Sequence, residues 1–178
     1  QFEICSKWVE HAEEGSWPDA DMLPFGHIAI RSEEHHRTDR WTEFSQDEQR
    51  FMMSLWCLAR SPLMFGGEMN DNEQFTLDLI TNREVLNILK ESKNNRQLYR
   101  VNDCAAWTAQ GEDGVTYLAH FNLNGVEKEI VTDLKQLGLS GEFKAKDIWE
   151  SKSLKNISQK VRSTVAPHAV KLYKLSSV

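Results

Sequence analysis

Two carboxylates separated by one residue, Asp19 and Asp21, have the type and spacing that most favour chemistry in this sequence. They lie in the stretch Trp17-Pro-Asp-Ala-Asp-Met22. On a β-strand, residues two apart point to the same face, so both carboxylates would project together while Ala20 points the other way. Such a pair can accept hydrogen bonds from hydroxyl groups or exchange protons with a substrate. The alternative is a turn, because Pro-Asp is also common turn chemistry.

The histidines are weaker candidates. His35 and His36 stand beside Glu33-Glu34, but adjacent side chains on a loop do not readily face one ion, so we expect no metal and no cofactor. His27 has two open interpretations, a residue at the rim of a pocket or a structural residue of its loop. His120 falls in a strand-like segment and is expected at the strand surface or at a domain interface.

The elements that position these side chains change character near residue 92. Before it, helix-like segments alternate with short apolar segments that follow Gly or Pro, which is typical of parallel βα units. Ser45 and Glu48 predict a capping box at the start of a helix whose residues 51–59 are apolar except Ser54, and which is therefore buried. Phe51 and Trp56 are assigned to its core. Further helices are expected at 1–13, 72–80 and 82–91, and a short buried strand at 63–65.

After residue 92, alternating apolar residues and hairpin-type turns predict an antiparallel β-sandwich or Greek-key domain. The polar, Asn-rich segment 90–97 is interpreted as the linker to it. The predicted strands cover 97–102, 104–110, 114–122, 126–133, 142–149, 153–157, 160–165 and 168–175.

Composition excludes several classes of protein. The chain has 178 residues and a net charge of −6, and residues 1–92 hold 8 Lys and Arg against 18 Asp and Glu. This acidic half argues against nucleic-acid binding, which needs a concentrated basic face. No apolar run approaches the roughly 20 residues of a membrane-spanning helix. Cys5, Cys57 and Cys104 are interpreted as buried thiols, although one disulfide stays possible.

The order and spacing of several motifs resemble glycoside hydrolase family 27, the α-galactosidases and α-N-acetylgalactosaminidases. The resemblance covers the end of the family's catalytic barrel and its C-terminal β-domain. The motifs are Gly15-Ser-Trp-Pro-Asp-Ala-Asp-Met-Leu-Pro-Phe-Gly-His-Ile28, Phe44-Ser-Gln-Asp-Glu-Gln-Arg50, Ser54-Leu-Trp-Cys-Leu-Ala-Arg-Ser-Pro-Leu-Met-Phe-Gly-Gly-Glu-Met69, Leu79-Ile-Thr-Asn-Arg-Glu-Val85, Asp147-Ile-Trp-Glu150 and Ala166-Pro-His-Ala-Val-Lys-Leu-Tyr173.

The resemblance implies a mixed α/β and all-β architecture. Residues 1–92 would be the last βα units of a (β/α)8 barrel, with the seventh strand in 15–23 and the eighth in 62–68. Residues 93–178 would be the antiparallel β-sandwich. The implied activity is retaining hydrolysis of terminal α-galactosidic or α-N-acetylgalactosaminidic bonds. The resemblance also favours a periplasmic or secreted location.

Asp21 and Met22 match family positions that line the sugar pocket, and Asp19 matches a second carboxylate that orders the strand end. Trp17 starts the motif and is expected to pack beneath it. All four are predicted to belong to the substrate-binding site. The family's nucleophile follows the fourth barrel strand and its acid/base the sixth, and neither motif appears here before residue 15. We therefore expect no catalytic residue in this sequence and no activity without the upstream part of the barrel. The expected partners are an α-galactoside-type carbohydrate and that upstream part. The alternative is a non-catalytic module that binds carbohydrate or has a structural role.

Overall fold

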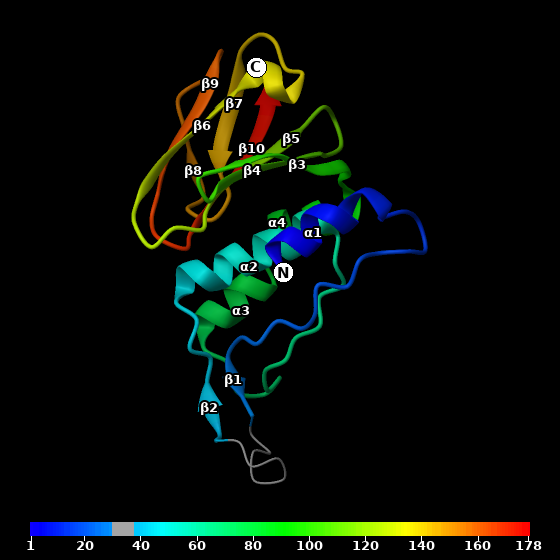
Figure 1. Ribbon diagram of the computed structural model, residues 1–178, viewed down its shortest axis with the longest axis vertical. Coiled ribbons are helices and arrows are strands. Elements are labelled where there is room, and N and C mark those ends of the chain that lie inside the picture. Colours follow the sequence, from blue (N-terminus) through cyan, green and yellow to red (C-terminus); the bar gives the residue numbers. More distant parts are fainter. Residues whose placement is uncertain (30–37) are drawn as a thin grey trace.

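The computed structural model describes residues 1–29 and 38–178. Figure 1 shows three levels along the long axis: strands at one end, helices in the middle, and largely irregular segments at the other end. The N-terminus lies among the helices, and the C-terminus lies among the strands. None of the described helices is long and apolar enough to cross a membrane.

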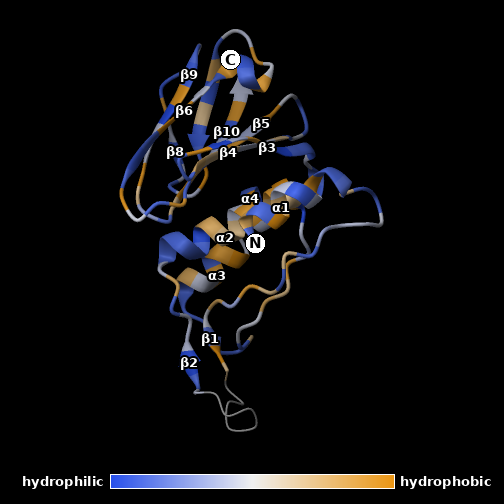
Figure 2. Cartoon of the chain, viewed as in Figure 1, coloured by the Kyte–Doolittle hydropathy of each residue, from blue (hydrophilic) through white to orange (hydrophobic). Residues whose placement is uncertain are grey.

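The helices are short, and α2 is the longest of those described. They are α1 (Phe2–Trp8), which continues as a 3-10 turn, α2 (Gln46–Ala59), α3 (Gln74–Ile80) and α4 (Arg83–Glu91). The predicted capping box is confirmed at α2, where Ser45 accepts from the Glu48 N–H and Glu48 binds back to Ser45. Figure 2 shows α2 changing from hydrophilic at its start to hydrophobic further along, and residues 53–59 are buried as expected.

The strands after residue 92 form two antiparallel sheets. The strands are β3 (Lys93–Val101), β4 (Cys104–Gln110), β5 (Thr116–Asn122), β6 (Lys128–Asp133), β7 (Phe143–Asp147), β8 (Lys152–Ser153), β9 (Lys160–Val165) and β10 (Val170–Ser177). One sheet has the order β3-β4-β5-β10-β7-β8, and the other pairs β6 with β9. The expected antiparallel sandwich is confirmed, because buried side chains of both sheets meet in one cluster that includes Leu118, Val161 and Tyr173. The predicted linker is wrong: only Ser92 separates α4 from β3.

His120 corrects another expectation, since it is fully buried between the two sheets and not at a strand surface. Its Nδ1 lies 2.7 Å from Ser163 Oγ of β9, and its Nε2 lies 2.8 Å from Thr132 Oγ1 of β6. The hydroxyls of Tyr173 and Tyr99 extend this network, each 2.8 Å from its partner. Burial lowers the pKa of His120 to about 3, so the ring is neutral and joins the sheets by hydrogen bonds alone.

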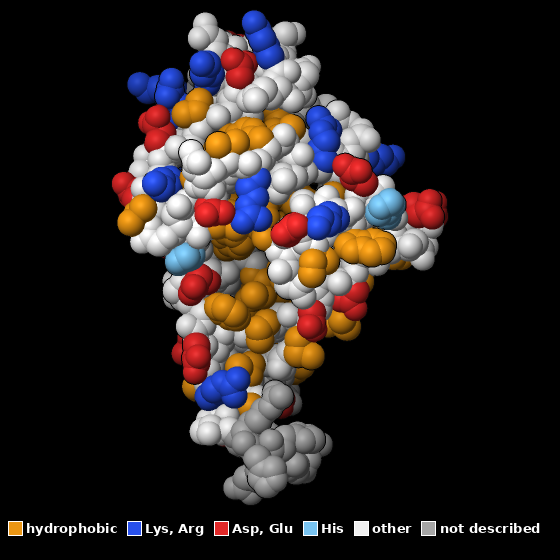
Figure 3. Space-filling model, viewed as in Figure 1, with side chains coloured by type: hydrophobic (Ala, Val, Ile, Leu, Met, Phe, Trp, Pro, Cys, Tyr) orange, Lys and Arg blue, Asp and Glu red, His pale blue; other side chains and the backbone are white. Residues whose placement is uncertain are grey.

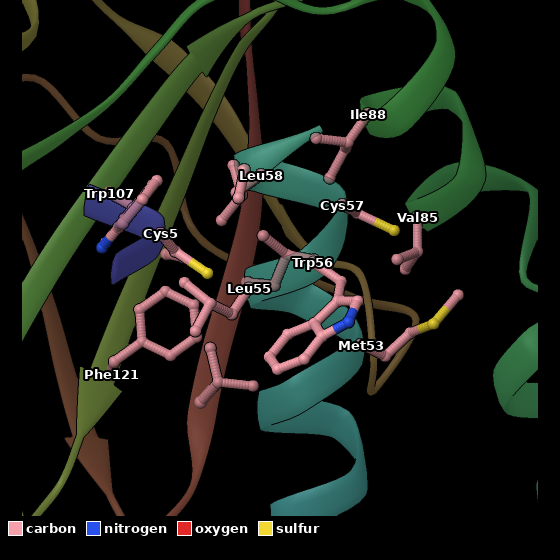
Figure 4. Close-up of a cluster of buried hydrophobic side chains, with 14 of the residues drawn as sticks. Cys5, Met53, Leu55, Trp56, Cys57, Leu58, Val85, Ile88, Trp107 and Phe121 are labelled. Carbon is pink, nitrogen blue, oxygen red and sulfur yellow. The ribbon is translucent and has the colours of Figure 1, made fainter. Parts of the chain in front are cut away.

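One hydrophobic core joins the helices to the larger sheet. Figure 4 shows α2 between two sets of side chains: Trp107 and Phe121 from the strands on one side, and Val85 and Ile88 from α4 on the other. The ring of Phe2 lies 5.9 Å from Phe51 and 5.4 Å from Phe121. The three cysteines are free thiols; Cys5 and Cys57 are buried and Cys104 is half-buried.

The segments expected to be the seventh and eighth barrel strands do not form regular strands. Residues 15–23 and 62–68 share a single parallel bridge, Leu23 with Phe65. Phe65 is only half-buried and Met64 is 46% exposed, so the buried strand predicted at 63–65 is also wrong. A parallel strand is normally buried on both faces between neighbours, and each of these segments has one such neighbour among the described residues.

Candidate functional site

The segment that carries Asp19 and Asp21 runs beside residues 64–68 at the irregular end of the molecule (Figure 1). The Leu23 N–H donates to the Met64 carbonyl at 2.7 Å, and the Gly66 N–H donates to the Leu23 carbonyl at 2.9 Å. Gly67 allows the two segments to approach closely, because a Cβ there would lie 2.3 Å from the Phe25 carbonyl oxygen. Backbone contact across this line therefore fixes where the carboxylates lie.

Asp19 and Asp21 belong to a turn and not to an extended strand, which corrects the expected side-by-side projection. The Asp21 N–H donates to Asp19 Oδ1 at 2.8 Å, and the Met22 N–H donates to Asp21 Oδ1 at 2.7 Å. Asp21 has a φ of +78°, in the left-handed region that few non-glycine residues occupy. The turn alternative is the one observed, because the Asp19 carboxylate binds the backbone two residues on, as aspartates commonly do.

The turn is tied to α2 and the residue after its C-terminal cap. The Ala20 N–H donates to Ser61 Oγ at 2.9 Å, and the indole Nε1–H of Trp56 donates to the Asp21 carbonyl at 2.7 Å. Ala20 and Ser61 are buried, whereas Asp19 and Asp21 are exposed. The sequence missed the role of Trp56. The signal that could have found it is that a buried indole N–H usually needs a hydrogen-bond acceptor.

The four predicted sugar-binding residues do not share one hollow. Trp17 and Asp19 line a cavity of about 320 Å³ against α1, together with Trp8 and Cys5. Asp21 and Met22 are not part of its lining, and Met22 packs beside Gly66. Both Trp17 and Met22 are exposed, at 45% and 54%. Each carboxylate of the turn uses Oδ1 for a backbone bond, which leaves Oδ2 available to accept hydrogen bonds from a ligand hydroxyl.

His27 is held between two acidic side chains. Its Nδ1 lies 2.6 Å from Asp71 Oδ2, its Nε2 lies 2.5 Å from Asp39 Oδ1, and its ring stacks on Trp41 at 4.9 Å. The hydrogen bond to Asp71, followed by that to Asp39, raises the pKa of His27. The structure therefore favours the structural interpretation: His27 in β1 (His27–Ile28) joins β2 (Arg40–Trp41) to the turn around Asp71.

No group of three or more His, Cys, Asp or Glu side chains within residues 1–29 and 38–178 could hold a metal ion. His35, His36 and the adjacent Glu33-Glu34 lie outside the described residues. Glu68 binds the backbone and side chain of Asn70 through Oε1, at 3.1 and 3.3 Å.

Comparison with known proteins places the whole chain beside glycosidases. The family model of the "Alpha galactosidase C-terminal beta sandwich domain" matches residues 101–175. α-Galactosidase 2 of Arabidopsis thaliana is 24% identical over 174 residues, 96% of this chain and 40% of the relative.

Two solved structures are more similar. A GH27 β-L-arabinopyranosidase from Geobacillus stearothermophilus is 43% identical, with a TM-score of 0.93, over 100% of this chain and 42% of that one. A putative α-N-acetylgalactosaminidase from Bacillus halodurans is 41% identical, also with a TM-score of 0.93, over 99% of this chain and 43% of that one. The chain thus spans 40 to 43% of the length of these three relatives.

Proposed function

Because the chain corresponds to the C-terminal portion of glycoside hydrolase family 27 proteins, we propose that it completes the active site of a retaining exo-glycosidase. Residues 1–92 form the last units of the catalytic barrel, and residues 93–178 form the β-sandwich domain. The observation that carries the proposal is the parallel pairing of Leu23 with Phe65, directly after the exposed Asp21 and Met22. Parallel neighbours connected through a helix are the building units of such barrels, whose sites lie where strands end.

The residues of the turn have different roles in this proposal. Asp21 accepts hydrogen bonds from sugar hydroxyls through its unused carboxylate oxygen, and the exposed Met22 lies against the sugar. Asp19 orders the turn, because its Oδ1 holds the Asp21 N–H. Trp17 lies in the neighbouring hollow and supports the motif from that side. The nucleophile and the acid/base are two carboxylates that this chain does not supply.

The substrate class is a terminal sugar with the galactose ring configuration. The names of the relatives support this class: one is a β-L-arabinopyranosidase, one a putative α-N-acetylgalactosaminidase, and others are α-galactosidases. β-L-Arabinopyranose has the ring configuration of α-D-galactopyranose without the hydroxymethyl group, so the ring hydroxyls are common to both. Asp21 binds these shared hydroxyls, and discrimination among the sugars belongs to other residues of the site.

An exposed apolar face supports the presence of a further part of the barrel. Ile4 and Trp8 on α1 are 50% and 56% exposed, and Trp17 lies beside them. Figure 3 shows hydrophobic side chains gathered over the middle of the molecule in this view. Apolar patches of this kind usually mark an interface. In the proposal, the upstream part of the same barrel covers them.

The test uses the full-length protein and four 4-nitrophenyl glycosides: α-D-galactopyranoside, β-L-arabinopyranoside, N-acetyl-α-D-galactosaminide and, as the control, α-D-glucopyranoside. We expect turnover of at least one of the first three and none of the glucoside. Asp21→Asn should lower kcat/KM by about 10- to 100-fold, as for a lost hydrogen bond to a charged group. Unchanged activity of Asp21→Asn would overturn the role given to this residue.

A second arm tests where the chemistry lies. The 178-residue chain alone should hydrolyse none of these glycosides, because both catalytic carboxylates are assigned elsewhere. Turnover by this chain at the rate of the full-length protein would place the catalytic pair within it and contradict the proposal.

A further inference from the structure

Trp56 combines two features that a core residue does not need to have together. Its side chain is buried, with 4% of the residue exposed, and its indole N–H donates to the Asp21 carbonyl at 2.7 Å. Figure 4 shows the indole nitrogen turned away from Phe121 and the strands. The hydrogen bond links residues 35 apart in the sequence. Trp56 thus reaches from α2 to the backbone of the residue assigned to sugar binding.

The backbone of Asp21 needs external support. Its left-handed φ of +78° is uncommon for a residue with a side chain, and such conformations persist where surrounding contacts hold them. Within the turn, the Asp19 carboxylate holds the Asp21 N–H. From outside the turn, Trp56 holds the Asp21 carbonyl and Ser61 holds the Ala20 N–H. The peptide groups on both sides of Asp21 are therefore fixed, which sets the direction of its carboxylate.

The other side of α2 is tied to the β-sandwich. Trp149, two residues after the end of β7, donates its indole N–H to Ser54 Oγ at 2.9 Å, and Ser54 is fully buried. Ser54 and Trp56 are two residues apart, so they face roughly opposite sides of the helix. Asn95 of β3 adds a second tie by donating to the Leu58 carbonyl at 2.9 Å. The helix therefore stands between the sandwich and the turn, with hydrogen bonds to both.

We propose that Trp56 is a positioning residue for Asp21, and that the β-sandwich supports the sugar pocket by fixing α2 through Trp149 and Ser54. The role of Trp56 rests on the proposed function, since it matters for catalysis only if Asp21 binds the sugar. The competing account is that Trp56 only fills the core. The two accounts differ in whether the N–H, as opposed to the ring, affects substrate binding.

Trp107 provides a matched control. It is fully buried in the same hydrophobic cluster, and its Nε1 has no hydrogen-bond partner among the described residues. Trp56→Phe and Trp107→Phe remove the same atoms from the same core, but only the first removes a hydrogen bond to the turn. Replacing Trp56 with 3-benzothienylalanine, which keeps the bicyclic shape and lacks the N–H, covers the case in which Trp56→Phe fails to fold.

Kinetics of the full-length protein give the first measurement. Trp56→Phe and the benzothienyl variant should raise KM about three- to tenfold, the range expected for one hydrogen bond. kcat should stay within about twofold, because a contact made equally in the ground and transition states changes KM. Trp107→Phe should leave KM unchanged. Trp149→Phe should raise KM by less than Trp56→Phe does, since it acts through the helix. Equal KM values in Trp56→Phe and Trp107→Phe would overturn the inference.

A second measurement does not depend on activity. In methyl-labelled full-length protein, the Met22 methyl resonance should shift in Trp56→Phe and keep its position in Trp107→Phe. Exchange of the Met22 amide, which is bonded to Asp21 Oδ1, should accelerate about three- to tenfold in Trp56→Phe only. If Asp21→Asn leaves hydrolysis intact while these changes occur, the proposed function fails and the positioning of the turn stands. If Asp21→Asn impairs hydrolysis and Trp56→Phe leaves the Met22 signals unchanged, the positioning role fails alone.

Discussion

The β-sandwich and the site-bearing segments, residues 15–23 and 62–68, hold their conformations in different ways. In the sandwich, β4 and β5 pair continuously from Cys104 with Asn122 to Gln110 with Thr116. The site-bearing segments are held by one parallel bridge and by close packing at Gly67. They are also held by hydrogen bonds from Trp56 of α2 and with Ser61, just after that helix. A ladder distributes stability over many backbone bonds, whereas the turn around Asp21 depends on a few side chains. Single substitutions should therefore affect the two regions differently.

The two regions also differ in the environment of their histidines. His120 in the sandwich is buried among hydroxyl groups, and desolvation lowers its pKa to about 3. His27 beside the site lies between Asp71 and Asp39, and its pKa is raised. One histidine stabilises the fold when it is neutral and the other when it is charged. The two regions should therefore respond to pH in opposite directions.

The largest expected effect breaks the shared core. Phe121→Ala should lower the free energy of unfolding by about 3–5 kcal/mol, because it removes a fully buried ring that packs against Phe2 and Phe51. Urea unfolding followed by far-UV circular dichroism and by tryptophan fluorescence should show one transition for both regions. Val101→Ala, at a 59% exposed position, is the control and should cost less than about 0.5 kcal/mol. Two separate transitions in the variant would mean that the regions do not share one cooperative core.

The second effect is acid destabilisation of the sandwich. Below pH 6.5 the unfolded His120 takes up a proton, while the folded ring stays neutral down to about pH 3. The unfolded state then binds more protons, so His120 should contribute a loss of up to about 1.4 kcal/mol per pH unit as the pH falls through this window. Urea midpoints at several pH values, compared between the wild type and His120→Gln, isolate this contribution. Parallel pH curves for the two proteins would rule it out.

Ser61→Ala tests the dependence of the turn on a single side chain. It leaves the buried Ala20 N–H without its 2.9 Å partner and should cost about 1–3 kcal/mol. Amide exchange should accelerate at Ala20 and Asp21 and remain unchanged in β4 and β5. The exposed Ser153→Ala is the matched control and should change neither. Faster exchange throughout the sandwich would show that the turn and the ladder are not independently held.

The smallest effect concerns His27. Because its folded pKa is raised, its ionic contacts stabilise the fold fully below pH 6.5 and are lost as the pH rises through the folded value. An NMR titration of the His27 ring should give a pKa above 6.5. Asp71→Asn should lower this pKa more than Asp39→Asn does, because the Asp71 hydrogen bond contributes most. A titration at the ordinary histidine value would mean that the two carboxylates do not hold the ring in solution.

The β-sandwich was easier to predict from the sequence than the site-bearing segments were. Local alternation and turn residues placed the strands at 104–110 and 160–165 with the bounds that the structure shows. The turn at Asp19 and Asp21 was open between two local alternatives, and contacts with Trp56 and Ser61 accompany the one observed. The acidic partners of His27 are 12 and 44 residues away, and no local pattern signals them. Features made by sequence neighbours were predictable, and features made by distant side chains were not.

The central claim is that Asp21 binds the terminal sugar of a substrate with the galactose ring configuration. A crystal structure of the full-length protein with D-galactose or L-arabinose tests it most directly. The account predicts an Asp21 carboxylate oxygen about 3 Å from a ring hydroxyl of the sugar, with Met22 in contact with it. A sugar bound in the active site with Asp21 still exposed and out of hydrogen-bond range would contradict the account.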